Sequence, residues 1–247
     1  AENTATASAL TIGSLTSTDP DTGNTFNYSL VGGDDQASFQ ITGNSLQFKA
    51  GTVLNYEAKS SYAVTVRTTD QGGLTYDEAL TVNLTNVNEK PTITAPAAQN
   101  VTQAAATAIT GISLLDPDAG TNLISLTLAA ATGTLTASNG SGVTVANSGT
   151  ASIILNGTQT NINSFISGGN VSYLGGPGVT GTDTLTISSD DGGNSGSGGT
   201  QTDSTTETLN IQVPNAAPVF TSGATGTVAE NAATSTVVYT ATATDPE

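Results

Sequence analysis

The 247-residue sequence contains no cysteine, histidine, methionine or tryptophan, and only 4 basic residues. Without cysteine or histidine there is no disulfide framework, zinc finger, haem ligand, cysteine protease or serine–histidine triad. The net charge of −16 repels nucleic acid and anionic membranes, which are bound by basic patches. No apolar run approaches the ~20 residues needed to cross a bilayer. We therefore expect no nucleic-acid partner and no membrane insertion.

The composition that remains is typical of β-strands and turns. Apolar residues make up 36% of the chain and charged residues only 10%, unlike a disordered chain. Threonine and valine suit strands, glycine and asparagine suit turns, and strong helix formers are scarce. We predict an all-β protein with many short strands. Because an initiator methionine and a basic-plus-apolar leader are absent, we also expect a mature or excised piece of a longer protein.

Residues 1–90 show the alternation of a half-buried sheet. Within 62–67 and 80–85, apolar residues occupy every second position, which places one face on a core and the other in water. The runs 39–41 and 46–48 flank a turn at 42–45, which is a hairpin signal. Seven of the eleven aromatic residues lie in this segment, so it can build a good core.

Two proline-containing linkers divide the chain. Pro91 restrains the residue before it and has no amide donor, and a second linker spans 213–218. We predict modules at 1–90, 91–214 and 215–247; the first lacks its first strand, and the last contains only the first strands of a further repeat.

The second module is expected to be a sandwich with an aliphatic and thin core, since it has only two aromatic residues. One helical turn is predicted at 161–166, with Thr160 or Asn161 as the N-cap. The Gly/Ser-rich stretch 192–199 is predicted to be a flexible hairpin loop. Strands are expected at 112–115, 123–128, 143–145, 152–155, 171–174, 184–188 and 206–213.

The end of the chain repeats its beginning. Ala229-Glu230-Asn231 followed by Asp245-Pro246 echoes Ala1-Glu2-Asn3 followed by Asp19-Pro20. Excision from a longer repetitive protein explains this echo. The alternative is strand exchange, in which the tail strand of one molecule completes the head module of the next.

The acidic residues gather in loops at the ends of strands. Asp19-Pro-Asp21 and Asp116-Pro-Asp118 alternate their carboxylates, and Asp70 and Asp190 each follow a strand. Hard oxygen ligands near glycine turns suit Ca²⁺, which takes 6–8 oxygens at ~2.3–2.6 Å, and no histidine or cysteine favours a transition metal. Because aspartate and glycine are also ordinary turn residues, the prediction of calcium rests on the ordered set and not on any single loop.

The first module resembles a cadherin repeat of the bacterial kind. The resemblance rests on Ala1-Glu2-Asn3, Asp19-Pro-Asp21, Leu54-Asn-Tyr-Glu57, Asp70-Gln-Gly72 and Asn86-Val-Asn-Glu-Lys-Pro91, which occur in family order. It implies tandem Greek-key β-sandwiches, cadherin- or immunoglobulin-like, arranged as a rod with calcium ions between successive domains. The ligands it implies at the junction are Glu2, Asn55, Glu57, Asn86, Asn88 and Glu89 from the first module and Asp116, Asp118 and Asp190 from the second.

The sequence departs from the family pattern at three of these positions. Asn55 and Asn86 stand where aspartate is usual, and Lys90 stands where asparagine is usual. Each departure removes charge or a ligand, so fewer ions or weaker binding are expected. Asp19, Asp21 and Asp70 would form a half-site for a preceding domain.

The second module resembles a cadherin-like module of giant secreted bacterial adhesins. The residues that carry this resemblance are Gly133-Thr-Leu135, Leu155–Asn163, Val171-Ser-Tyr173, Gly181–Ile187 and the loop 190–199. Gln103 replaces the glutamate expected near its start, and Ala216 occupies the acidic position of the second linker. A calcium site is therefore predicted between modules one and two, and a weak or missing site between modules two and three.

These observations predict a non-enzymatic, calcium-rigidified spacer of a large extracellular or cell-surface bacterial adhesin or filament that supports cell adhesion. Its partners would be neighbouring cadherin-like domains of the same protein, with like molecules head to tail and surface glycans as further candidates. One alternative is a calcium-dependent carbohydrate-binding module, for which Tyr56 and Tyr76 are the candidate platforms, although both suit a core or strand edge. Another is a self-assembling filament subunit joined by strand exchange. Paired carboxylates could serve glycoside hydrolysis, but these acids sit in turns and the second module lacks aromatic residues to line a sugar cleft.

Overall fold

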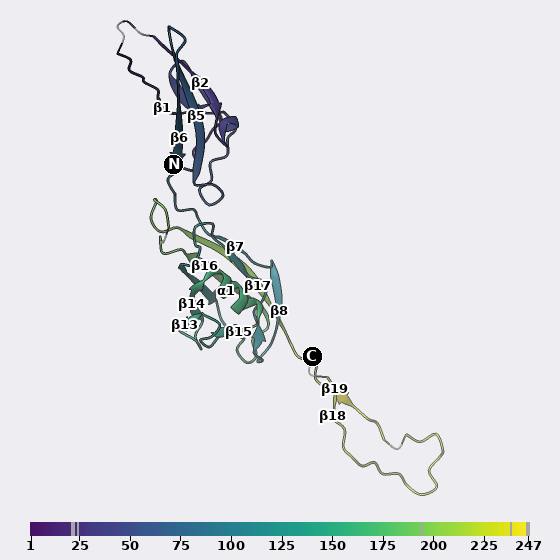
Figure 1. Cartoon of the computed structure of the whole chain (residues 1–247). Coiled ribbons are helices and arrows are strands. Elements are labelled where there is room, and N and C mark those ends of the chain that lie inside the picture. Colours follow the sequence, from purple (N-terminus) through teal and green to yellow (C-terminus); the bar gives the residue numbers. More distant parts are fainter. Residues whose placement is uncertain (21–22, 24, 194, 238, 246–247) are drawn as a thin grey trace.

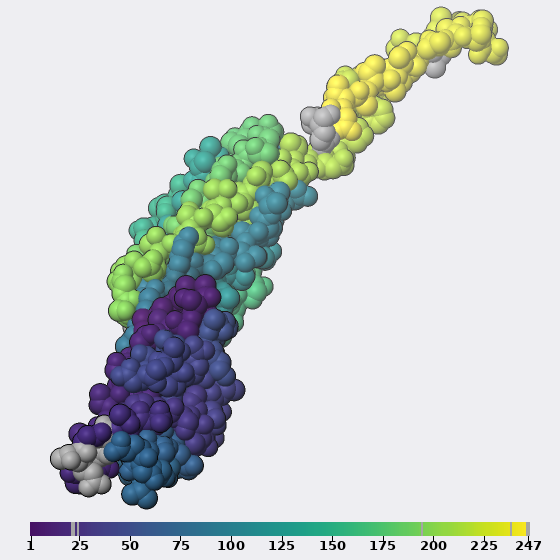
Figure 2. Space-filling model, turned by 90° about the horizontal axis from the view of Figure 1, so that it is seen from above, coloured from purple at the N-terminus to yellow at the C-terminus, as the bar shows by residue number. Residues whose placement is uncertain are grey.

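The protein is described from a computed structural model, which covers residues 1–20, 23, 25–193, 195–237 and 239–245. Two β-sandwiches follow one another along an elongated molecule, and the last residues extend beyond the second sandwich (Figures 1 and 2). We call residues 1–85 the head sandwich, 91–212 the second sandwich and 213–245 the tail. The prediction of a mostly β protein is confirmed.

The head sandwich consists of two three-stranded sheets. One has the order β1 (Leu10–Ser14), β4 (Ser45–Phe48), β3 (Phe39–Thr42), and the other has the order β2 (Phe26–Gly32), β5 (Ser61–Asp70), β6 (Thr75–Asn83). The predicted hairpin is present, since β3 pairs with β4 from Phe39–Phe48 to Thr42–Ser45. A short 3-10 helix, η1 (Gln36–Ser38), precedes it.

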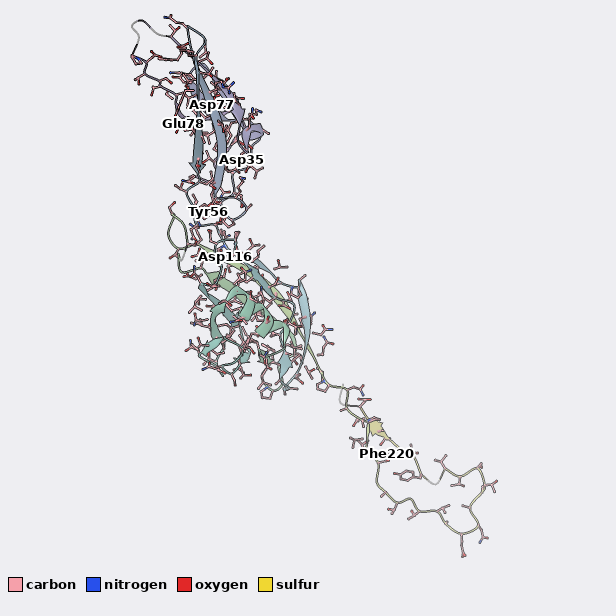
Figure 3. All side chains as sticks on the ribbon, viewed as in Figure 1. Asp35, Tyr56, Asp77, Glu78, Asp116 and Phe220 are labelled. Atoms are coloured by element: carbon pink, nitrogen blue, oxygen red, sulfur yellow. The ribbon has the colours of Figure 1, made fainter. Side chains whose placement is uncertain are left out.

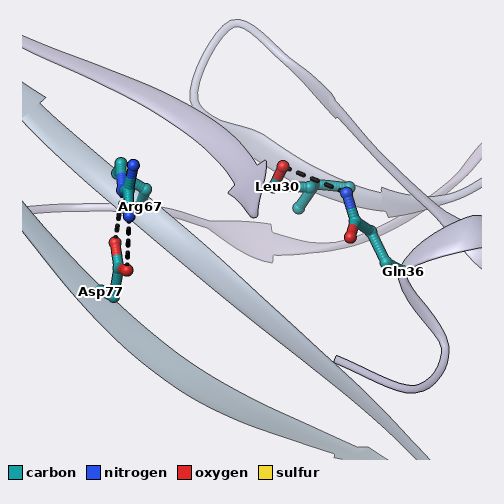
Figure 4. A network of polar contacts seen from close by, with 4 residues as sticks. All are labelled: Leu30, Gln36, Arg67 and Asp77. Carbon is teal, nitrogen blue, oxygen red and sulfur yellow. Dashed lines mark hydrogen bonds and ion pairs between the residues drawn. The ribbon is translucent and has the colours of Figure 1, made fainter. Parts of the chain in front are cut away.

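Aromatic rings fill the core of the head sandwich. The rings of Phe39 and Phe48 stack with centroids 4.8 Å apart, and Tyr62 meets both edge-on. On the outer surface, Arg67 of β5 donates to both carboxylate oxygens of Asp77 on β6, at 2.6 and 2.8 Å (Figure 4). The side-chain amide of Gln36 donates to the backbone oxygen of Leu30 and joins η1 to β2 (Figure 4).

The second sandwich has a six-stranded sheet as its main layer. Its order is β13 (Thr144–Ala146), β14 (Ser152–Thr158), β11 (Leu123–Ala130), β16 (Gly181–Asp190), β17 (Thr202–Gln212), β8 (Ala98–Thr102). A smaller sheet has the order β12 (Thr134–Thr136), β15 (Ser172–Leu174), β9 (Thr107–Ala108), and β10 (Ser113–Leu115) pairs with β7 (Thr92–Thr94).

The core of the second sandwich is aliphatic, as predicted, but it is not thin. Leu126, Leu128, Ile153 and Leu155 are fully buried at alternate positions of β11 and β14, and their cluster is larger than the core of the head sandwich. Isoleucine and leucine side chains from β11, β14, β16 and β17, with a valine each from β13 and β8, take the place of aromatic rings, so the low aromatic count was a poor measure of core size.

The helix is longer than predicted and begins earlier. α1 (Gln159–Ser167) follows β14 directly, and its N-cap is Thr158, whose hydroxyl accepts from the amide of Asn161. The prediction of Thr160 or Asn161 as the N-cap was therefore wrong, because the last residue of the strand already has the extended backbone that an N-cap requires. Ile162, Phe165 and Ile166 lie on the buried face of α1.

The tail has one short pairing, between β18 (Val219–Phe220) and β19 (Ala243–Thr244). The large apolar side chains of its described residues are exposed, among them Phe220 (Figure 3). Within the described ranges, no helix is long and apolar enough to span a bilayer.

Candidate metal centre between the two sandwiches

The linker between the sandwiches is held by the loop 191–199 of the second sandwich. Val87 forms a parallel bridge with Ser197, whose amide donates to the backbone oxygen of Asn86 at 3.1 Å. The amide of Asn88 donates to the backbone oxygen of Ser197 at 2.8 Å. The prediction that 192–199 is a flexible hairpin loop is corrected for its described residues, because this loop pairs with the linker.

Close packing explains why a glycine occupies position 196 of that loop. Its φ is +76°, and a Cβ there would lie 2.3 Å from Oδ1 of Asn86 and 2.4 Å from the backbone nitrogen of Asn88. Only glycine allows the loop this close to the linker. A second tie follows in the chain, where Nζ of Lys90 lies 2.7 Å from Oδ1 of Asp203 on β17.

Glu2 anchors the acidic centre on the head side. Its side chain is only 2% exposed. Oε1 accepts from the amide of Val87 at 2.7 Å and Oε2 accepts from the amide of Tyr56 at 2.6 Å, so one carboxylate joins two loops. Glu2, Glu57 and Glu89 each offer a carboxylate oxygen, and these three oxygens all lie within 4.8 Å of one another.

The second sandwich contributes Asp116 and Asp118, both buried, from the loop after β10. Oδ2 of Asp118 accepts from the backbone amide of Glu89 in a short contact, which ties the second sandwich to the linker. Oδ1 of Asp116 accepts from the amide of Asp118 at 3.0 Å and so shapes the loop. Figure 3 shows Tyr56 and Asp116 on the two sides of this junction.

Burial and the closeness of other carboxylates raise the pKa values of carboxyl groups in this cluster. Burial, together with Asp118 and Glu2, raises the pKa of Glu89 to about 7. Burial and the same two neighbours also raise the pKa of Glu57. Burial raises the pKa of Asp116, with contributions from Asp191 and Asp118. The protein thus gathers carboxylates here without a cation of its own to offset their charge.

Three buried oxygens at the junction have no hydrogen-bond partner among the described residues. They are Oδ1 of Asn86 and Oε2 of Glu89 in the linker and Oδ1 of Asp118 in the second sandwich. Buried polar atoms are normally paired, and a group made up only of acceptors suits a bound cation. The donor set consists of hard oxygens and fits Ca²⁺.

Two asparagines of the predicted set have structural contacts. Oδ1 of Asn55 accepts from the amide of Ala58 at 2.6 Å, which caps a turn beside the cluster. Nδ2 of Asn88 donates to Oδ2 of Asp191 at 2.6 Å and to the backbone oxygen of Gly199 at 2.7 Å. Asn88 therefore holds the loop against the linker.

The structure places Asp191, not Asp190, at the junction. Asp190 is exposed and accepts from the amide of Gly192, whereas Asp191 is buried. The alternation along β16 carries the signal that separates them, because Asp191 shares the inward parity of Leu185 and Ile187.

Asp19 and Asp70 lie away from this centre. Asp70 ends β5 and faces Phe26, while the start of β5 at Ser61 faces Asn83 near the junction. Oδ1 of Asp70 accepts from the amide of Leu74 at 2.8 Å. Asp21 lies outside the described residues. The structure thus separates Asp19 and Asp70, which line one groove, from the junction by the length of β5.

Comparison with known proteins finds a family model that matches the head sandwich. Residues 2–85 match the family model of the cadherin domain. This match covers the head sandwich, and it supports an extracellular, non-enzymatic module of the adhesion type. No curated protein sequence matches the chain.

The solved structures similar to the chain include several protocadherin ectodomains. Protocadherin gamma B2 extracellular cadherin domains 3–6 share 20% identity with it, over 97% of this chain and 51% of that one, with a TM-score of 0.50. The protocadherin gamma B4 extracellular domain shares 20% identity, over 99% and 36% of the two chains, with a TM-score of 0.49. For human protocadherin-24 EC1-2 the identity is 14%, the coverages are 84% and 90%, and the TM-score is 0.46. The chain spans about half the length of the first of these, and at this identity the likeness shows a cadherin-like fold alone.

Proposed function

We propose that the chain is a non-enzymatic spacer of an extracellular adhesion protein, stiffened by calcium at the junction of its two sandwiches. The observation that carries this proposal is that carboxylates of the head sandwich, the linker and the second sandwich lie close together, namely those of Glu2, Glu57, Glu89 and Asp118. Among them, Oε2 of Glu89 and Oδ1 of Asp118 are buried without a hydrogen-bond partner in the described part of the chain. A bacterial surface adhesin or filament is the setting that the sequence motifs favour.

Electrostatics explains why a cation would act as a mechanical element here. Two carboxylates about 5 Å apart repel by roughly 3 kcal/mol at an effective dielectric constant of ~20. Without a cation, this repulsion is relieved by protonation or by separating the sandwiches. A bound Ca²⁺ reverses its sign and favours the closed junction, by ~2.7 kcal/mol when calcium is at about a hundredfold excess over Kd.

The residues would divide this work between them. Glu2, Glu57, Glu89 and Asp118 would supply the charged ligands, and the side-chain oxygen of Asn86 a neutral one. Asp116, Asn88 and Asp191 would hold the two loops in place through the hydrogen bonds described above. The second linker, 213–218, is exposed over its length, which supports a weak or missing calcium site there.

Calorimetry and thermal unfolding test the proposal. Adding Ca²⁺ to the chelator-treated chain is expected to raise its Tm, and Glu89→Gln is expected to weaken binding by about tenfold or more, since it removes a charged ligand. Glu78→Gln is the matched control, because Glu78 is an exposed acid on β6 away from the junction. If the Tm of the wild-type chain does not change when Ca²⁺ is added, the proposal is contradicted.

A carbohydrate-binding module is the second candidate, and the exposure of Tyr76 favours it. Its ring is 67% exposed, whereas Tyr56 packs against the core of the head sandwich. A glycan array tests this function. Glycan binding that is lost in Tyr76→Ala and retained in Tyr56→Phe would support it, and the absence of binding by the wild type excludes it for the glycans on the array.

A further inference from the structure

The slow covalent reactions open to this chain involve asparagine rather than sulfur. Cysteine and methionine, whose sulfur atoms are oxidised stepwise, do not occur in it. The carboxamide of asparagine reacts with the backbone nitrogen of the next residue, and glycine obstructs this attack least because it has no Cβ. The sequence contains two Asn-Gly pairs, at 139–140 and 156–157. The structure gives these two pairs opposite environments.

The first pair lies in the loop between β12 and β13, where Asn139 is exposed. Gly140 and Val143 form an isolated antiparallel bridge around a turn made by Ser141 and Gly142, whose φ angles are +51° and +76°. A Cβ at position 140 would have no atom within 4 Å, so the backbone around the attacking nitrogen is uncrowded. The amide of Gly140 donates to the backbone oxygen of Val143 at 3.1 Å, and such a bond in an exposed turn opens more readily than the ladder of a sheet.

The side chain of Asn139 is held in a way that favours attack on its Cγ. Oδ1 accepts from the backbone amide of Val145 at 2.7 Å, and a donor at this oxygen stabilises the negative charge that develops on it during the attack. Nδ2, the nitrogen that must leave, has no hydrogen-bond partner among the described residues. Asn139 also lines an open hollow of about 420 Å³ with Ser138 and Ser148, which gives water access to the loop.

The second pair is held inside a sheet. Asn156 belongs to β14, which is paired on both sides, and it lies opposite Ser125 of β11 and Thr144 of β13. Gly157 is buried, and a Cβ there would lie 3.0 Å from the backbone oxygen of Gly142. A strand paired on both sides keeps its backbone extended, so the nitrogen of Gly157 reaches the carboxamide of Asn156 only after β14 opens.

We propose that Asn139 is a site of spontaneous deamidation, whereas Asn156 is protected by the fold. The nitrogen of Gly140 gives its proton to a base in the solvent and forms a bond to Cγ of Asn139. The bond between Cγ and Nδ2 then breaks, and the leaving nitrogen takes up a proton from the solvent and departs as ammonia. One water molecule opens the resulting succinimide ring at either of its carbonyl carbons, which leaves aspartate or isoaspartate at position 139. No atom changes its oxidation state.

Isoaspartate at this position would alter the edge of the six-stranded sheet. It inserts Cβ of residue 139 into the main chain and adds a negative charge to a chain whose net charge is already −16. β13 follows the turn directly, is the outermost strand of the sheet, and pairs with β14 only over residues 144–146. A longer main chain just before so short a pairing would loosen β13 and leave the edge of β14 unpaired.

Peptide mapping by mass spectrometry, after the whole chain has been incubated at mildly alkaline pH, tests the proposal. In the folded chain Asn139 is expected to convert at least about tenfold faster than Asn156, because Asn156 reacts only when β14 opens. In urea, which removes this protection, the two pairs should convert at similar rates. Gly140→Ala is expected to slow the conversion of Asn139 by about tenfold or more, since the added Cβ obstructs the attacking nitrogen but meets no atom of the fold.

A folded chain in which Asn139 stays unconverted, or converts no faster than Asn156, overturns the proposal. Hydrogen exchange of the separated isoaspartate form tests the effect on β13. The amides of 144–146 are expected to exchange faster than in the unmodified chain, while those of β8, the other outer strand, serve as control. Unchanged exchange in β13 contradicts its loosening. Conversion is measured with Ca²⁺ and with chelator, and it should be equal in both, because no proposed calcium ligand lies in this loop and the result is independent of the proposed function.

Discussion

Two buried carboxylates of the second sandwich, Asp183 and Glu207, have opposite environments. Asp183 accepts from the amide of Gly133 at 2.9 Å and from the hydroxyl of Tyr173 at 2.8 Å. Burial opposes its ionisation, but the bonds from Tyr173 and from backbone amides outweigh it and lower its pKa. Glu207 has no partner for either carboxylate oxygen in the described part of the chain, and burial raises its pKa to about 7.

Opposite pH dependences of stability follow for these two residues. Because the pKa of Asp183 is lower in the folded state than in the unfolded state, its carboxylate stabilises the fold at pH values above the unfolded-state pKa. This stabilisation is lost as the pH falls through the folded-state pKa. A raised pKa makes Glu207 destabilising as pH rises from about 4.5 to about 7, because the folded state must give up a proton it binds more tightly than the unfolded state does. We expect Asp183→Asn to lower the free energy of unfolding at neutral pH by about 2–4 kcal/mol.

Glu207→Gln is expected to raise the free energy of unfolding at about pH 8, by up to roughly 3 kcal/mol, and to flatten its decline between about pH 4.5 and 7. Urea unfolding across the pH range measures both variants. Asp190→Asn serves as control, since its exposed carboxylate should leave the unfolding midpoint almost unchanged. If the free energy of unfolding of Glu207→Gln has the same pH dependence as that of the wild type, the Glu207 carboxylate has an interaction partner in the folded protein.

At the scale of elements, the loop 191–199 acts as a clamp on the linker. Gly196→Ala is expected to push this loop away from Asn86 and Asn88, lowering Ca²⁺ affinity by about tenfold because one buried oxygen at the centre belongs to Asn86. Gly178→Ala is the matched control, with a similar φ of +77° but no atom within 4 Å of the added Cβ. It should cost about 1–2 kcal/mol in backbone strain and leave Ca²⁺ affinity intact.

Titration calorimetry of the two glycine variants separates clamping from strain. If both lose affinity equally, the backbone conformation matters and the contact between the loop and the linker does not. If neither variant loses Ca²⁺ affinity, the loop is not part of the metal centre.

The sequence predicts strands well where buried and exposed residues alternate along the strand. β11 and β14 bury alternate residues, and the apolar positions that define this alternation are visible in the sequence. β8 was not predicted, because it has a single buried apolar residue, Val101, and forms only by pairing with β17 more than a hundred residues away. Such long-range pairing leaves little local signal.

The same distinction applies to the candidate metal centre. The acidic motifs predicted which loops would supply carboxylates, and the structure brings Glu2, Glu57, Glu89 and Asp118 together. The contact between loop 191–199 and the linker could not be read from the sequence, since a Gly/Ser-rich stretch is equally typical of a free loop. Strand parity would have favoured Asp191 over Asp190.

At the scale of the whole molecule, charge and shape act together. Two sandwiches of an acidic chain meet at a short linker, where the bridge between Val87 and Ser197 and an ion pair from Lys90 lie beside a cluster of carboxylates. Like charges at this point favour separation, and under the proposed function either protons or a cation would offset them. Protons and Ca²⁺ should therefore compete for the same oxygens.

This competition predicts how shape depends on pH and Ca²⁺. Because Glu89 has a pKa of about 7 without a cation, apparent Ca²⁺ affinity should fall as pH decreases below about 7, since binding must then displace a proton. Small-angle scattering at about pH 8 should show a longer and narrower distribution of molecular dimensions with Ca²⁺ than with chelator. In Glu89→Gln the Ca²⁺-dependent change should shrink, while Glu78→Gln should behave as the wild type. Scattering curves of the wild type that coincide with and without Ca²⁺ would show that the junction is rigid on its own and that the carboxylates have another role.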